Sequence, residues 1–171
     1  ISAYLETKNT AFVKAAEKAA NYLISVQDSN GLFIEHEDYC VANQTTNTYH
    51  TRVALGLVAL GKLTENETYL EAGVKNIEYR LQFQTANGWF RDNCLSDAQN
   101  PLVHTICYAL EGFLGVGLLL NKEQYLEAVM LTADHLLEKI DQKGFLGGRF
   151  DRNWNCCVDW SCLTGNAQFA I

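Results

Sequence analysis

Apolar residues recur at three- and four-residue steps along the segment 66–84, with charged and polar residues between them. The apolar positions are Leu70, Val74, Ile77 and Leu81. This spacing predicts an amphipathic outer helix that packs on a core through one face. The segments 53–60 and 106–120, in contrast, are apolar almost all round and contain small residues. They are predicted to be inner helices that are buried on several sides.

This order of outer and inner helices repeats along the chain. The segment 12–33 aligns without a gap with 69–90, and a third copy begins at Tyr125. Matched pairs include Ala15 and Ala72, Lys18 and Lys75, Gln27 and Gln84, and Gly31 and Gly88. The period of about 56 residues indicates stacked supersecondary units. We expect one domain, 1–171, with copies at 7–47, 48–102 and 103–159 and the start of another at 160–171.

Buried helices that alternate with amphipathic ones predict an all-α fold. Two architectures fit this order, an α/α toroid and an open solenoid of helical hairpins. The loops 88–103 and 144–160 are much longer than the connection of about 2–8 residues that usually joins packed helices. Such loops favour the toroid, so the predicted fold is a partial α/α toroid built from helical hairpins of about 56 residues with long loops. The glycine after each outer helix is expected to stop that helix.

The motif Gln-x-x-x-Gly-x-aromatic occurs at 27–33 and again at 84–90. It resembles the glutamine–tryptophan motif of the terpenoid cyclase and protein prenyltransferase toroid superfamily. The resemblance implies that the Gln side chain ties the end of an outer helix to its neighbour, while the aromatic ring packs against the repeat. The third copy departs from the motif, because Ile140 stands at the position of the Gln.

The rings of this superfamily contain more hairpins than this chain supplies. The chain is expected to start in an outer helix near Thr10 and to end as an inner helix, 160–171, begins. The apolar flanks of the inner helices would then be exposed. We expect the remainder of a longer polypeptide, or self-association, to cover the open ring. The segment 159–168 is similar to inner-helix entries in uncharacterised bacterial toroid proteins that are associated with carbohydrate metabolism.

The net charge narrows the choice of partners. A formal charge of −7 and a pI near 5.0 argue against nucleic acids and anionic membranes, because those partners need clustered Lys and Arg. The longest apolar runs, such as 53–60 and 113–120, are too short to span a bilayer. A soluble protein with a small-molecule or sugar ligand is expected.

The cysteines bear on compartment and metal binding. Six are present: Cys40, Cys94, Cys107, Cys156, Cys157 and Cys162. The chain is neither small nor cysteine-dense, so we expect reduced thiols and a cytoplasmic location. The cluster at 156–162 offers zinc-ligand types, but it lacks a Cys-x-x-Cys pair, and its spacing differs from that of prenyltransferases and lanthionine cyclases. Neither a metal nor a cofactor is predicted.

Four side chains are candidate acid/base groups. They are His104, Asp92, Asp151 and Asp159. His104 stands just before a Thr at the start of an inner helix, as His50 does, and histidine changes charge near neutral pH. Its functional role would be proton transfer at the mouth of the ring, and the alternative is packing at a helix entry. A glycosidase would need two of the carboxyl groups about 5–10 Å apart.

Flat aromatic and charged side chains in the long loops suit a sugar ligand. Aromatic rings can stack on the apolar faces of a sugar, while charged groups bind its hydroxyls. The candidate ligand-binding residues are Trp89, Arg91, Trp154, Trp160 and Gln168. In the alternative interpretation the tryptophans only pack the repeats, and Arg91 forms a surface ion pair. Gln168 on the last inner helix would bind either a neighbouring hairpin or a ligand, because a buried amide needs a partner.

Three functions fit this sequence. The first is a carbohydrate-processing or carbohydrate-binding toroid. The second is a fragment of a cyclase- or prenyltransferase-like enzyme, although the acidic Asp-x-Asp-Asp cluster of proton-initiated cyclases is absent. The third is a repeat scaffold without catalysis, which would be favoured if Trp89 and Trp154 fill the mouth. Fold alone does not choose among them, because one fold hosts many chemistries.

Overall fold

The computed structural model describes residues 1–34, 47–94 and 96–171. Its elements are α1 (Ser2–Thr7), α2 (Thr10–Ser25), the short 3₁₀ helix η2 (Thr48–His50), α3 (Thr51–Thr64), α4 (Glu67–Leu81), α5 (Val103–Leu120), α6 (Glu123–Leu137) and α7 (Leu163–Phe169). Only isolated bridges, and no extended strands, occur in these described residues. The predicted all-α fold is confirmed.

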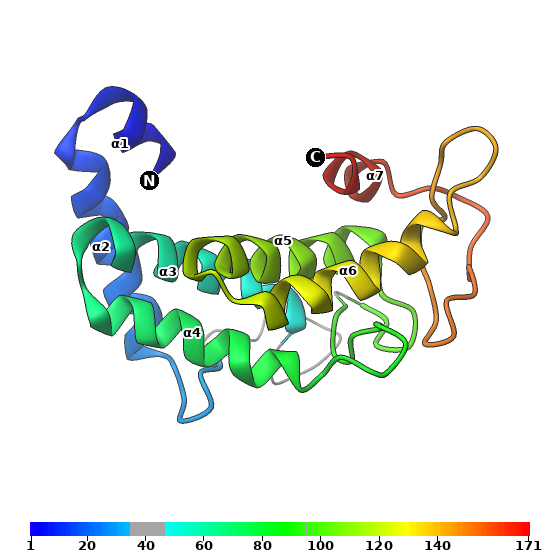
Figure 1. The fold of residues 1–171 in the computed structure, drawn as a ribbon, viewed down its shortest axis with the longest axis horizontal. Helices are drawn as coiled ribbons and strands as arrows, with labels where there is room; N and C mark the ends of the chain where they lie inside the picture. The colour runs from blue at the N-terminus through cyan, green and yellow to red at the C-terminus, as the bar shows by residue number, and fades with distance from the viewer. Residues whose placement is uncertain (35–46, 95) are drawn as a thin grey trace.

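The helices form an arc of layers (Figure 1). The inner helices α3 and α5 pack side by side, α4 lies against α3, and α6 lies against α5. The short helices α1 and α7 lie on the opposite side of the α3 and α5 layer from α4 (Figure 1). We call the side of α3 and α5 that faces α1 and α7 the concave face.

The helices α1, α3 and α5 end with the same backbone conformation before the next helix begins. Lys8, Glu65 and Asn121 follow α1, α3 and α5, and all three adopt the left-handed conformation with φ of 56°, 55° and 53°. This conformation is a common helix ending. The next helix then starts from an asparagine in two copies, where Asn9 Oδ1 and Asn66 Oδ1 accept backbone hydrogen bonds. The repeat is therefore one of backbone geometry as well as of sequence.

The glutamines of the repeated motif tie successive outer helices together. Gln27 Nε2 donates to the backbone oxygen of Ala72 at 2.9 Å, and Gln84 Nε2 donates to that of Ala128 at 2.7 Å. The two bonds are equivalent, because Ala72 and Ala128 occupy matching positions in successive copies of the repeat. The role that the sequence resemblance implied for these side chains is thus observed.

The prediction that glycines stop the outer helices was wrong. α2 and α4 end at Ser25 and Leu81, well before Gly31 and Gly88. Each glycine instead has a positive φ, of 88° and 80°, in the tight turn that follows the motif glutamine. A Cβ on Gly31 would lie 2.7 Å from the backbone nitrogen of Asn76. The glycine is required by this close approach to the next outer helix.

Two boundaries also differ from the expectations. No pattern in the sequence indicated α1, a short helix that precedes the expected start at Thr10. The last inner helix begins at Leu163 rather than at Trp160. The backbone oxygen of Trp160 accepts a hydrogen bond from Gly148 N at 2.7 Å, so this residue belongs to the preceding loop.

The core is centred on α5. Its buried residues include Val103, Ile106, Phe113 and Val116. By length and composition α5 is also the one helix in the described ranges that could cross a membrane, and 56% of its 18 residues are buried inside the structure. Burial between α3, α6 and α7 accounts for its apolar composition.

Candidate functional site

A stripe of polar side chains interrupts the apolar surface of α5. His104, Tyr108 and Glu111 follow each other at steps of four and three residues, so they share one face of the helix. Glu111 is exposed, and the two rings are partly buried. Most of the positions between them on α5 are buried, so this stripe is where the helix offers polar groups to a ligand.

His104 is held by the last helix. Its Nδ1 lies 2.7 Å from Oε1 of Gln168 on α7. An amide oxygen can only accept, so with this amide orientation Nδ1 carries the hydrogen. The neutral ring then keeps its lone pair on Nε2, where it can accept a proton. The ring of Tyr108 also contacts the imidazole, with a distance of 4.3 Å between the two ring centroids.

Arg52 at the start of α3 completes the group. Its Nε lies 2.8 Å from Oε2 of Glu111, and its guanidinium carbon lies 4.2 Å from the centroid of Tyr108. The two charged side chains are 43% and 44% exposed, so the ion pair contributes little to stability. The contacts nevertheless join three helices in one polar row: Arg52, His104, Tyr108, Glu111 and Gln168.

A groove of about 390 Å³ adjoins this polar row. Arg52, Glu111 and Gln168 line its polar edge, and side chains of α5, α6 and α7 supply an apolar floor. Cys107 lies on this floor, and burial raises the pKa of its thiol to about 12. The thiol is therefore neutral and does not act as a nucleophile.

Of the predicted site residues, the polar row contains His104 and Gln168. Arg91 donates to the backbone oxygen of Gln82 at 3.1 Å and lies over the ring of Phe83. The neighbouring Asp92 has a φ of 50°, and its backbone oxygen accepts a bond from Thr48. Both residues lie in the loop after α4 rather than in the polar row.

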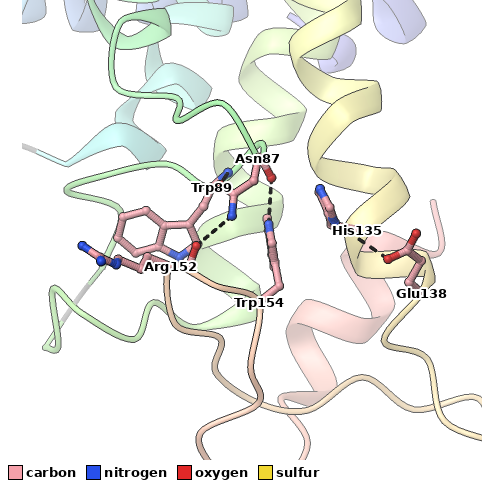
Figure 2. Close-up of polar contacts among 6 residues, drawn as sticks. All are labelled: Asn87, Trp89, His135, Glu138, Arg152 and Trp154. Atoms are coloured by element: carbon pink, nitrogen blue, oxygen red, sulfur yellow. Dashed lines mark hydrogen bonds and ion pairs between the residues drawn. The ribbon is translucent and has the colours of Figure 1, made fainter.

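Trp89 and Trp154 pack the long loops against each other (Figure 2). Trp154 Nε1 donates to the backbone oxygen of Asn87 at 2.8 Å, and its ring stacks on that of His135 at 5.6 Å. Trp89 Nε1 donates to the backbone oxygen of Phe150 at 3.4 Å. The two residues are 6% and 3% exposed. These positions favour packing, and their role in ligand binding remains a prediction.

The other predicted carboxylates lie elsewhere. Asp151 accepts hydrogen bonds from Asn155 and Asn153 within its own turn, and these bonds hold its pKa below the usual range. Asp159 and Trp160 line a separate cavity of about 320 Å³ beside the loop after α6. In the described part of the chain, Asp151, Asp159 and Trp160 therefore do not form one site with His104.

A buried polar cluster lies beneath the loop that follows α4. Arg80 on α4 is fully buried, and its Nε and Nη2 have no hydrogen-bond partner among the described residues. Its pKa is lowered to about 10 by burial. The pKa of His50 falls to about 4, first because of burial and second because of the Arg80 charge. His50 is therefore neutral at physiological pH and is an unsuitable acid.

Sequence reasoning missed three members of the polar row. They are Arg52, Tyr108 and Glu111. A usable signal was present, because His104, Tyr108 and Glu111 recur with helical spacing on α5, the most apolar of the described helices. Arg52 was not detectable, since its place in the row depends on the packing of α3 against α5.

Layers and hairpins of this kind define an α/α toroid. The chain is similar in structure to the unsaturated glucuronyl hydrolase of Bacillus sp. GL1, with a TM-score of 0.79, 14% sequence identity and coverage of 98% of this chain and 49% of that enzyme. It is also similar to cellobiose 2-epimerase from Bacillus thermoamylovorans, with a TM-score of 0.70, 15% identity and coverage of 97% and 47%. A D-mannose isomerase gives a TM-score of 0.66 at 17% identity, with coverage of 93% and 43%.

These similarities establish the fold, and the chain spans about half the length of each of these enzymes. The α/α toroid is therefore confirmed, whereas membership of the terpenoid cyclase superfamily is not shown. The sequence matches no protein-family model and no curated protein. In the described ranges, no group of three or more His, Cys, Asp or Glu side chains is arranged to hold a metal ion.

Proposed function

We propose that this chain is a carbohydrate-processing domain that binds a sugar on its concave face. The observation that carries the proposal is the polar row, in which an aromatic ring lies between an arginine, a histidine and a carboxylate. The charged and polar groups of such a row can bind the hydroxyls of a sugar in pairs. The similar solved structures include a glucuronyl hydrolase, an epimerase and an isomerase that act on carbohydrates, which supports the same class.

The reaction that suits this row is proton transfer. His104 offers Nε2 as a base, because Gln168 holds its Nδ1. The base would take the proton from the carbon beside the carbonyl of an open-chain sugar, and the electron pair would move onto the carbonyl oxygen. The guanidinium of Arg52 would stabilise that oxygen. Return of the proton to the other face of the same carbon gives an epimer. Return of the proton to the former carbonyl carbon, with transfer of the neighbouring hydroxyl proton to the former carbonyl oxygen, gives an isomer.

Hydrolysis by two carboxylates has less support. Glu111 is the single carboxylate of the row, and it is paired with Arg52. Asp92, Asp151 and Asp159 lie in three other places. An ordinary glycosidase needs two carboxyl groups across the scissile bond.

Hydrogen exchange tests the proposal directly. The protein is incubated in heavy water with cellobiose, mannose or glucuronic acid, and deuterium at the carbon beside the carbonyl is measured by mass spectrometry. We expect incorporation with the wild-type chain, a loss of at least about 100-fold in His104→Gln, and no loss in the control His135→Gln on α6. An absence of both exchange and sugar binding in the wild type would reject the proposal. It would favour the scaffold interpretation, which the packing of Trp89 and Trp154 supports.

A further inference from the structure

A guanidinium with unpartnered nitrogens is enclosed beneath the loop that follows α4. Arg80 of α4 is 0% exposed, and its Nε and Nη2 have no hydrogen-bond partner among the described residues. Burial lowers the pKa of Arg80 to about 10, which is still well above neutral pH, so the side chain stays charged inside the fold. A buried charge of this kind is costly unless it is both paired and hydrogen-bonded.

The two unpartnered nitrogens form one edge of the guanidinium. Their N–H groups project from the same side of the planar group, and such a pair of donors can bind one anion together. The ring of Phe83 covers a face of the guanidinium, with 4.7 Å between the ring centroid and Cζ of Arg80. A ring stacked on the face cannot accept hydrogen bonds from N–H groups that point outward in the plane, so the edge still needs an acceptor.

No described carboxylate forms an ion pair with this edge. Arg80 takes part in neither of the ion pairs that join described residues. Asp92 is the acidic residue that most favours its charge, but the Asp92 carboxylate lies beyond ion-pair distance. The pKa of His50 is lowered first by burial and second by the Arg80 charge, so the guanidinium also lies near the end of η2.

Further buried polar atoms belong to the same junction. Thr48 of η2 donates through its backbone nitrogen to the oxygen of Asp92 and through Oγ1 to that of Arg91, both at 2.7 Å. The neighbours of this contact, Asn47 and Asn93, are 2% and 1% exposed. Asn47 Oδ1 and both amide atoms of Asn93 have no partner in the described ranges. Buried groups of this kind commonly bind ordered water or an ion.

We propose that Arg80 binds one small monovalent anion, such as chloride or formate, inside the fold. Nε and Nη2 hold the anion, and its negative charge compensates the buried guanidinium. Because Arg80 is fully enclosed, the ligand is a small ion rather than a sugar, and its role is to stabilise the junction between α4 and η2. The proposal goes beyond the carbohydrate proposal and does not depend on it, since Arg80 lies outside the polar row.

Urea unfolding in three sodium salts tests the site. The wild-type chain is dialysed into gluconate, whose anion is too large to be enclosed, and chloride or formate then replaces gluconate at constant ionic strength. We expect a small anion to stabilise the fold along a saturating curve, with a rise of about tenfold in the folding equilibrium constant at ten times the dissociation constant. Arg80→Met should abolish this response. Arg152→Met is the matched control and should keep it, because Arg152 is exposed.

A second variant and a direct measurement locate the anion. Arg80→Lys keeps the charge but lacks the two-nitrogen edge, so it should raise the dissociation constant at least about tenfold, and it serves as the test should Arg80→Met fail to fold. Crystals grown in sodium bromide should show an anomalous peak beside Nε and Nη2 of Arg80. Three outcomes would each overturn the proposal: an equal response of the wild type to all three anions, an unchanged response in a folded Arg80→Met chain, or a guanidinium edge bonded to a carboxylate of the chain itself in those crystals.

Discussion

The side-chain amide of Gln84 donates a hydrogen bond of 2.7 Å to the backbone oxygen of Ala128 in the next hairpin. The same nitrogen donates to Thr132 Oγ1 at 3.0 Å. Thr132 in turn donates to the backbone oxygen of Gly88 at 2.6 Å. One partly buried amide therefore connects the end of α4 to the middle of α6.

Gln84→Leu removes both bonds while it keeps most of the side-chain volume. Thr132 is fully buried. Loss of the amide removes a hydrogen bond to its hydroxyl and one to the backbone oxygen of Ala128, so the free energy of unfolding should fall by about 1–3 kcal/mol. Urea unfolding measures the change. Gln82→Leu is the control, because Gln82 is exposed and its side chain makes none of these bonds. Equal losses in the two variants would show that the amide does not join the hairpins.

His50 should make the fold sensitive to acid. Its pKa in the folded chain is about 4, mainly because of burial and also because of Arg80, against 6.5 in the unfolded chain. Between these values the unfolded chain binds a proton that the folded chain does not, so stability falls as pH falls from about 6.5 toward 4. The loss should approach about 2–3 kcal/mol. Urea unfolding at about pH 7 and about pH 4.5 measures it.

Two variants identify the group responsible. His50→Gln should flatten the stability profile in this window. Arg80→Met removes the second cause of the shift, so the profile should become shallower without vanishing. Carboxylates such as Asp151, whose pKa is lowered, lose their contribution only at lower pH. An unchanged profile in His50→Gln would assign the acid sensitivity to another group.

Thiol alkylation should separate the cysteines by burial. Cys107 is 4% exposed and its pKa is about 12, so few molecules present a reactive thiolate. Cys156 is exposed and should react with iodoacetamide at least about 100 times faster at neutral pH. Mass spectrometry of labelled peptides follows both residues. Rapid labelling of Cys107 in the absence of denaturant would contradict its burial beneath the groove.

Much of the fold was predictable from the sequence, because the same order of inner and outer helices repeats along the chain. Inner helices were recognised from apolar segments with small residues, and α4 from its amphipathic spacing. The boundaries of α1 and α7 were not predicted, since each short helix depends on contacts with α2 or α5 rather than on its own pattern. Gly31 and Gly88 were wrongly predicted to end the outer helices. Their positive φ instead forms a turn that packs closely against the next hairpin, and this contact cannot be read from the sequence.

The site was less predictable than the fold. His104 and Gln168 were identified as functional candidates, but their mutual contact joins residues 64 positions apart. Aromatic rings in the loops suggested ligand binding, yet Trp89 and Trp154 have their indole nitrogens bonded to backbone oxygens. A sequence shows that a tryptophan is present, but only packing decides whether its face is open to a ligand.

Trp154 should therefore be structural. Its ring is 3% exposed and lies against His135 and Phe150, so Trp154→Ala should lower the free energy of unfolding by about 3–5 kcal/mol. Trp160 is 45% exposed, and Trp160→Ala should cost less than about 1 kcal/mol. Urea unfolding followed by circular dichroism compares the two.

A second measurement separates packing from binding at the same residue. Trp154→Phe keeps an aromatic ring beside His135 but loses the bond to Asn87, so a smaller loss of about 1–3 kcal/mol is expected. Its affinity for a sugar that binds the wild type should stay within about twofold, because Trp154 lies outside the polar row. A folded Trp154→Phe chain that loses sugar binding would instead place the ligand in the long loops and would move the site away from His104.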